Sequence, residues 1–221
     1  MHGQARRRAK PSSRVVAPVG LRSGVSDALA EPDPGAALAV AFPRSLAAAA
    51  SAVVRTVPAA SRDPVRPFRV SVAGSPVVIP YRIYSAEPAD TECAALTRTQ
   101  RAMLDCLYTR HHDGYVRERR LERVVGLAEP WVAPFVVQLV GEYVDEILLV
   151  VRRALVRALS TPGSVVASVY ARFAAENPDF IDRTEQRVVS YWNCYYRYRY
   201  PSLRDYPGSA VVAALRSAGQ G

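Results

Sequence analysis

Alternation of hydrophobic and polar residues marks the first ordered segment of the chain. In "FRVSVAGSPVVIPYRIY", residues 68–84, the apolar side chains recur at every second position on both sides of Gly74-Ser75, at Phe68, Val70, Val72, Val77, Ile79, Tyr81 and Ile83. A period of two around a glycine turn predicts a β-hairpin. Pro80 has no N–H for a ladder hydrogen bond, so we expect the second strand at a sheet edge or the proline at a bulge.

Helical spacing begins after the acidic link "SAEPADTE". Thr97 and Gln100 form a capping-box pattern, and the apolar positions that follow predict a helix that ends near His111. Asp113 is then placed to cap a second helix, whose apolar stripe runs through Leu121, Val124, Val125 and Ala128. This second helix should end before Pro130.

The longest apolar pattern lies in "PFVVQLVGEYVDEILLVVRRALVRAL", residues 134–159. Its spacing predicts one helix of about 24 residues. Six charged residues within it exclude a membrane span, since each would cost several kcal/mol in lipid. Glu142 and Glu146 carry like charges four positions apart, which favours a solvated ridge or partners for the arginines of 117–123 over paired catalytic carboxylates.

The remaining sequence predicts three further elements and a leader. We expect a helix at 163–176, a helix from Arg183 to about Arg199 that Asp182 caps, and a terminal apolar piece. Residues 1–66 are rich in Ala, Pro, Arg and Ser and are predicted to be a largely disordered basic leader, with a short helix possible at 44–56. The predicted fold is therefore mainly α, with five to six helices packed as helical pairs and a short β-hairpin, in one domain over 67–221.

One segment resembles a known repeat family. Asp113, two further residues and then Val116-Arg117, followed by Leu121, Val124 and Val125, is similar to the second helix of a HEAT repeat. "LTRTQRAMLDCLYTRH" stands where the first helix of the repeat would be. The resemblance covers about 32 residues and implies helix pairs that pack side by side. It implies no activity.

Charge and cysteine content narrow the function classes. The formal charge is +9, but residues 1–60 hold 8 basic and 3 acidic groups and residues 61–221 hold 21 and 17, so the folded part is nearly balanced. This distribution weakens a nucleic-acid interpretation. Cys93, Cys106 and Cys194 are widely spaced and include no C-x-x-C pair, which argues against a disulfide framework or a zinc knuckle. We expect a reducing, cytoplasmic location, no metal and no cofactor.

The segment "YTRHHDGYVRERR", residues 108–120, concentrates groups that can carry chemistry. A metal site would need another ligand from elsewhere, and a dyad of His112 and Asp113 in a hydrolase-type enzyme would need a nucleophile nearby. The favoured interpretation is a structural helix junction. Its residues would be His111, His112, Asp113 and Gly114, with the histidines near a helix C-terminus and the aspartate as the next cap.

The second unusual segment is "RVVSYWNCYYRYRYP", residues 187–201, with five tyrosines, one tryptophan and three arginines. Three interpretations stay open: a helix that completes the core, an anchor for a protein partner, and a stacking platform for single-stranded nucleic acid. We expect a non-enzymatic protein-interaction or scaffold protein with an unidentified partner, nucleic-acid binding being the alternative, and no membrane contact. The predicted binding surface consists of Arg117, Arg120, Tyr191, Trp192, Tyr195, Tyr196, Arg197 and Arg199.

Overall fold

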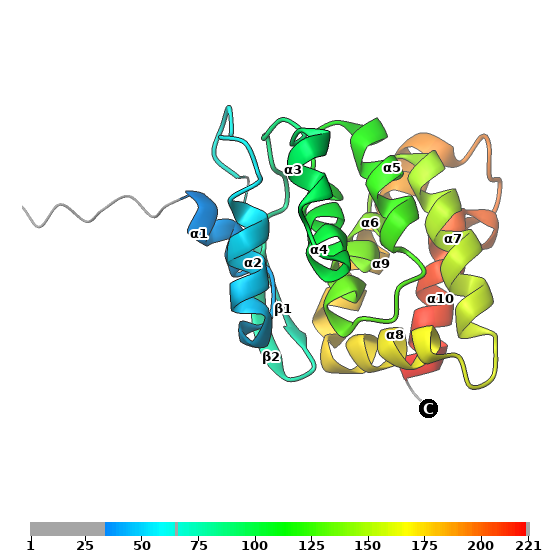
Figure 1. The fold of residues 1–221 in the computed structure, drawn as a ribbon. Helices are drawn as coiled ribbons and strands as arrows, with labels where there is room; N and C mark the ends of the chain where they lie inside the picture. Colours follow the sequence, from blue (N-terminus) through cyan, green and yellow to red (C-terminus); the bar gives the residue numbers. More distant parts are fainter. Residues whose placement is uncertain (1–33, 65, 220–221) are drawn as a thin grey trace, which may run out of the picture. The chain divides into compact units, whose positions relative to one another are not determined.

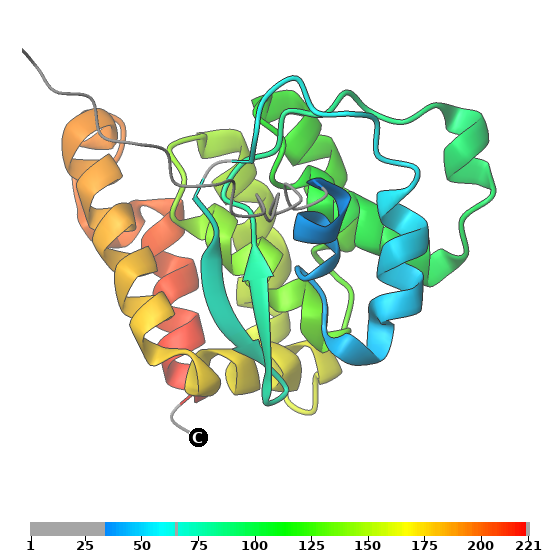
Figure 2. The ribbon, with the colours of Figure 1, turned by 90° about the vertical axis from the view of Figure 1, so that its left-hand side faces the viewer.

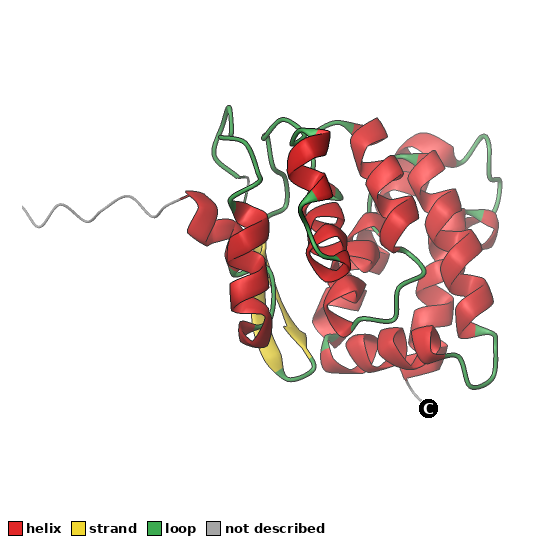
Figure 3. Cartoon of the chain, in the orientation of Figure 1, coloured by secondary structure: helices red, strands yellow, loops and turns green. Residues whose placement is uncertain are grey.

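The computed structural model describes residues 34–64 and 66–219, and helices dominate this part of the chain (Figure 3). Its ten α-helices are α1 (Pro34–Ala39), α2 (Ala47–Val54), α3 (Asp90–Ala94), α4 (Arg98–Tyr108), α5 (Gly114–Val124), α6 (Ala133–Val140), α7 (Asp145–Leu159), α8 (Val165–Glu176), α9 (Pro178–Tyr191) and α10 (Pro207–Gly219). The mainly α prediction is confirmed, but the predicted number of five to six helices is wrong. Breaks within the apolar pattern and short helices before residue 95 account for the difference.

The predicted β-hairpin is confirmed. Strands β1 (Phe68–Val72) and β2 (Ser75–Ile79) pair antiparallel, with Phe68 opposite Ile79. One face of the hairpin is buried, and Pro80 follows the last residue of β2, where no ladder donor is needed. The Asn177 side chain joins the outer edge of β1 to the end of α8, because its amide bonds the N–H of Ser71 at 2.7 Å and the Ser71 carbonyl at 2.9 Å.

Residues 34–64 correct the predicted leader, whose remaining part, 1–33, lies outside the described residues. Helices α1 and α2 flank the hairpin and α4 (Figure 2), and the predicted short helix at 44–56 corresponds to a 3₁₀ turn at Arg44–Leu46 followed by α2. Phe42 is buried against Trp131 and Phe135, with ring centroids 5.7 and 5.5 Å apart. The hydrophobic pattern does not predict this packing, because buried residues such as Ala41 and Ala50 are small and add little hydrophobicity.

Helices α2, α4, α5 and α7 follow one another across the molecule (Figure 1). The capping box of Thr97 and Gln100 opens α4, and Asp113 caps α5 by accepting from the Tyr115 N–H at 2.8 Å. Both predicted starts are confirmed. Helices α4 and α5 pack against each other, and the HEAT-like resemblance of this segment stays a prediction.

The single helix predicted over 134–159 is two helices, with a break between α6 and α7 at residues 141–144. Gly141, at this break, leaves room for the Arg187 side chain, because a Cβ there would lie 2.7 Å from Arg187 Nε. Glu142, next in the chain, turns inward and is 2% exposed. The apolar period continues through the break, which is why the sequence pattern alone does not reveal it.

The C-terminal helices also differ from prediction at their ends. Helix α9 begins at Pro178, not at Arg183, and Asp182 binds Arg216 of α10 instead of capping a helix. Its last part widens into a π-turn, Trp192–Tyr196. Helix α10 packs against α7, α8 and α9 and fills the centre of this half of the core. Among the described residues, none of the helices combines the length and the apolar character needed to cross a bilayer.

Candidate functional site

A buried arginine cluster lies at the break between α6 and α7. The two oxygens of Glu142 each accept a hydrogen bond from Arg82, both at 2.8 Å. Arg117 Nε lies 3.2 Å from Glu142 Oε2, and Arg110 Nη1 lies 3.7 Å from Oε1. One carboxylate therefore faces three guanidinium groups, which come from the segment after β2, the end of α4 and the first turns of α5.

Burial leaves these charges poorly solvated. Arg110 is 0% exposed, and neither of its terminal nitrogens has a hydrogen-bond partner within the described residues. Burial lowers the pKa of Arg110 to about 9, and the nearby Glu142 charge only partly opposes this effect. Burial likewise lowers the pKa of Arg117. Arg110 therefore lacks, within the described residues, the close hydrogen-bonded carboxylate that usually accompanies a buried guanidinium.

Arg187 of α9 extends the cluster toward solvent. Its side chain lies against Gly141, its Nη2 is 3.2 Å from Gln138 Oε1, and its Nε has no hydrogen-bond partner among the described residues. Tyr191 lies one turn further along α9. Burial raises the pKa of Tyr191, and the positive charges of Arg187 and Arg82 oppose this rise. The aromatic part of α9 therefore borders the arginine cluster.

Three tyrosines next to this cluster form a row, which we call the tyrosine row: Tyr143, Tyr191 and Tyr195. Ring centroids are 5.9 Å apart for Tyr143 and Tyr191 and 6.2 Å apart for Tyr191 and Tyr195. Tyr143 and Tyr195 are 55% and 60% exposed. Large aromatic side chains left this exposed in neighbouring positions are a feature of binding surfaces.

Three other aromatic residues of the same segment, Trp192, Tyr196 and Tyr200, are turned inward and hold the π-turn in place, whereas Tyr198 is 85% exposed. Trp192 donates from its ring N–H to the Tyr200 carbonyl at 2.8 Å, and Tyr200 donates to Asp145. The Tyr196 hydroxyl donates to the Tyr143 carbonyl, which ties the π-turn to the α6–α7 break. Of the aromatic residues in the predicted binding surface, Tyr195 is therefore exposed and Tyr191 is half-buried, whereas Trp192 and Tyr196 pack against the core.

Two arginines of the predicted surface are exposed and two are buried. Arg199 pairs with the buried Asp145 at 2.9 Å, and Arg197 lies over the Trp192 ring, 5.1 Å from its centroid. Arg117 and Arg120 are only 2% and 6% exposed, so their prediction as surface residues is wrong. Each has a carboxylate partner inside the protein, Glu142 for Arg117 and both Asp105 and Glu87 for Arg120.

The buried Arg120 guanidinium has carboxylate acceptors for its hydrogen bonds. It donates to Asp105 at 2.7 Å and to Glu87 at 2.9 and 2.6 Å. These hydrogen bonds and charges raise the pKa of Arg120, although burial acts in the opposite direction. Arg120 is thus compensated, in contrast to Arg110.

The histidine segment lies at the junction of α4 and α5, as predicted. His111 is buried, its Nε2 lies 3.1 Å from the Ser85 carbonyl, and its Nδ1 accepts from the Asp113 N–H at 3.1 Å. His112 is exposed and stacks on Tyr84. Both ring nitrogens of His111 are thus engaged with backbone groups, and Gly114 begins α5. Within the described residues, no three His, Cys, Asp or Glu side chains are grouped to hold a metal ion.

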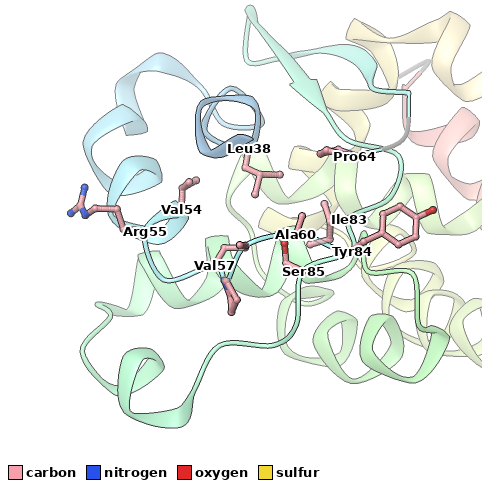
Figure 4. Close-up of a pocket in the computed structure, with 11 residues that line it drawn as sticks. Leu38, Val54, Arg55, Val57, Ala60, Pro64, Ile83, Tyr84 and Ser85 are labelled. Carbon is pink, nitrogen blue, oxygen red and sulfur yellow. The ribbon is translucent and has the colours of Figure 1, made fainter. Parts of the chain in front are cut away.

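A pocket of about 450 Å³ is lined in part by residues 83–85, which the histidines of this junction contact (Figure 4). Its lining is largely apolar, with Leu38 and Val57 on one side and Ile83 and Tyr84 on the other. The junction supports the second side, because His112 stacks on Tyr84 and His111 binds the Ser85 carbonyl. The histidine rings are absent from the lining, so the pocket and the proposed catalytic dyad do not form one site.

Sequence reasoning found only part of the arginine cluster. Glu142 was a predicted partner for arginines of 117–123, and Arg117 is such a partner. Arg82 was hidden in an alternating strand pattern, Arg110 in a helical stripe, and Arg187 at the start of the aromatic segment.

Comparisons with protein families, with curated proteins and with solved structures yield no match to this chain.

Proposed function

We propose that this protein is a non-enzymatic interaction or scaffold protein that binds a protein partner through the tyrosine row. The observation that carries the proposal is the exposure of Tyr143 and Tyr195 on either side of Tyr191 in a row of adjacent rings. Tyrosine presents a large, amphipathic contact area at a low cost in conformational entropy, which is why it is common among interface hot spots.

Rigid support of the row favours the same proposal. Tyr143 belongs to the α6–α7 break, and its carbonyl is bound by the Tyr196 hydroxyl. Trp192 and Tyr200 fix the π-turn from the interior side. A surface held in this way loses little freedom on binding, so more of the contact free energy contributes to affinity.

The nucleic-acid alternative receives less support from the same segment. Stacking platforms for single strands combine aromatic rings with cations that are free to contact phosphates. Here Arg199 is committed to Asp145 and Arg197 lies over Trp192 and bonds Asn193. A cytoplasmic location is part of the proposal, and the thiols of Cys93, Cys106 and Cys194, which form no disulfide, support it.

Site-specific crosslinking tests the proposal. A photoreactive phenylalanine analogue at position 195 should capture a defined partner in the native host, and the same analogue at position 115 is the control. Tyr115 is 80% exposed on α5 and lies outside the tyrosine row. The captured partner is then purified and its Kd measured against the wild type and Tyr195→Ala.

We expect Tyr195→Ala to weaken the affinity by about thirtyfold or more, which corresponds to the roughly 2 kcal/mol of a hot spot. Tyr115→Ala should leave the affinity unchanged. Equal losses for the two variants would contradict the proposal. Sub-micromolar, steeply salt-dependent binding of a short single-stranded oligonucleotide that Tyr195→Ala abolishes would replace it with the nucleic-acid alternative.

A further inference from the structure

The arginine cluster carries more positive charge than its own carboxylate can neutralise. Arg82, Arg110 and Arg117 all point at Glu142, and Arg187 lies against the adjoining Gly141. Three guanidinium groups around one carboxylate, together with the Arg187 guanidinium beside Gly141, leave an excess of three positive charges if all are ionised. The buried Arg120, in contrast, is balanced by Asp105 and Glu87.

Hydrogen-bond donors are in excess as well. Both terminal nitrogens of Arg110, the Nε of Arg187 and the amide nitrogen of Gln138 are buried and without hydrogen-bond partners within the described residues. Almost all buried donors in native proteins find an acceptor, so a group of unsatisfied donors in one place indicates an acceptor that is not part of the chain. An anionic acceptor suits these donors best, because most of them belong to guanidinium groups.

Access to the cluster is open on one side. The Arg82 side chain is 15% exposed, whereas those of Arg110 and Arg117 are 0% and 2% exposed. Arg187 is half-buried, and Tyr81 lies under the Arg82 guanidinium, 4.8 Å from ring centroid to Cζ. An anion that approaches from solvent would meet Arg187 and would compete with Glu142 for the Arg82 guanidinium, while the two deeper arginines strengthen the positive potential beneath it.

We propose that the arginine cluster is a binding site for a phosphate-type oxyanion, which contacts Arg82 and Arg187 next to Tyr191. Guanidinium groups bind phosphate and sulfate through paired, charge-assisted hydrogen bonds. A dianion matches an excess of three positive charges better than a monoanion does. The oxyanion is either free inorganic phosphate or a phosphate monoester on a larger molecule. This inference is independent of the tyrosine row and of any protein partner.

Titration of the full chain with inorganic phosphate at constant ionic strength tests the inference. We expect saturable binding of one equivalent by calorimetry and a rise in Tm that follows the same saturation curve. Arg82→Gln should weaken phosphate binding by about tenfold or more, since a charge-assisted hydrogen bond is lost. Arg153→Gln, which removes an exposed arginine of α7, is the matched control and should bind phosphate like the wild type.

Arg187→Gln keeps the test decisive if Arg82→Gln folds poorly, and Glu142→Gln adds a measurement at temperatures where this less stable variant is folded. Arg187→Gln should weaken binding similarly, because Arg187 provides the second contact. Glu142→Gln removes the competing carboxylate, so it should bind phosphate more tightly than the wild type and gain more in Tm from it. A purely structural role of Glu142 would leave phosphate affinity unchanged in this variant.

O-phosphoserine titrated in parallel distinguishes the two sources of the oxyanion. Binding as tight as that of inorganic phosphate indicates a site open to phosphate esters, and binding of inorganic phosphate alone indicates a counter-ion site. The inference is overturned if the wild type shows no saturable phosphate binding. It is overturned equally if Arg82→Gln, Arg187→Gln and Arg153→Gln all bind phosphate like the wild type. Neither result would affect the crosslinking test of the tyrosine row.

Discussion

Glu142 and Arg82 form a two-point contact across 60 residues of sequence, with both carboxylate oxygens at 2.8 Å from guanidinium nitrogens. The contact joins the segment after β2 to the break between α6 and α7. It therefore couples the N-terminal and C-terminal halves of the core through a charge that is 2% exposed.

Replacement of Glu142 by Gln should destabilise the fold by about 3–5 kcal/mol, since removal of one partner from a buried ion pair leaves the other charges uncompensated. Glu146→Gln is the matched control, as Glu146 is exposed in the first turn of α7, and it should cost less than about 1 kcal/mol. Urea denaturation in phosphate-free buffer measures both. Similar small losses for the two variants would show that Glu142 is not an electrostatic link.

Deletion of the Phe42 side chain tests how the segment before the hairpin contributes to stability. Phe42 is 4% exposed and contacts both Trp131 and Phe135, so Phe42→Ala should cost about 3–5 kcal/mol. Val40 lies two residues earlier and is 50% exposed, and Val40→Ala should change stability by about 0.5 kcal/mol at most. If Phe42→Ala is equally mild, the segment does not pack in solution as it does in the structure.

The Phe42 segment also shows where sequence reasoning fails in this protein. Alternation between Phe68 and Ile79 and the caps at Thr97 and Asp113 are local signals, and the structure confirms them. Burial of Phe42 depends on Trp131 and Phe135, which lie about ninety residues further along the chain. Prolines nearby suggested disorder, but packing of α2 against α1 and α4 is a tertiary effect that the local sequence does not report.

The candidate site was predictable only in part for a related reason. A cluster of aromatic and basic residues in 187–201 identified Tyr191 and Tyr195 as candidates by composition. The π-turn decides which rings face outward, and no pattern in the sequence reports a π-turn. Tyr143 was assigned to a continuous helical stripe, because the break at Gly141 preserves the apolar spacing on both sides.

His111 should make stability depend on pH. Burial lowers the pKa of His111 below its ordinary value of 6.5, and the nearby His112 acts in the same direction. The unfolded chain therefore takes up a proton first as pH falls, so this contribution to stability is fully present above about pH 6.5 and is lost as pH falls toward the folded-state pKa. Protonation would also place a hydrogen on Nδ1, which accepts from the Asp113 N–H.

Denaturation curves measured from pH 7.5 to pH 5 check this expectation. His111→Gln should flatten the decline in stability, and His112→Gln, at the exposed neighbour, should keep it. An unchanged slope in His111→Gln would assign the pH dependence to other groups.

Arg197 and Arg199 should differ in their contributions to stability although both are exposed and only two residues apart. Arg199 is 52% exposed at its side chain and pairs with Asp145, whose side chain is 3% exposed and also accepts from Tyr200. Because Asp145 keeps the Tyr200 hydroxyl when Arg199 is removed, Arg199→Gln should cost only about 1 kcal/mol. Arg197 contacts Trp192 and Asn193 at the surface, so Arg197→Gln should change stability by about 0.5 kcal/mol at most.

Urea denaturation at low and high salt separates the Arg199→Gln and Arg197→Gln variants, since the Arg199 contribution should shrink as salt screens its exposed charge. Equal, salt-independent values for both variants would mean that Asp145 is satisfied without Arg199.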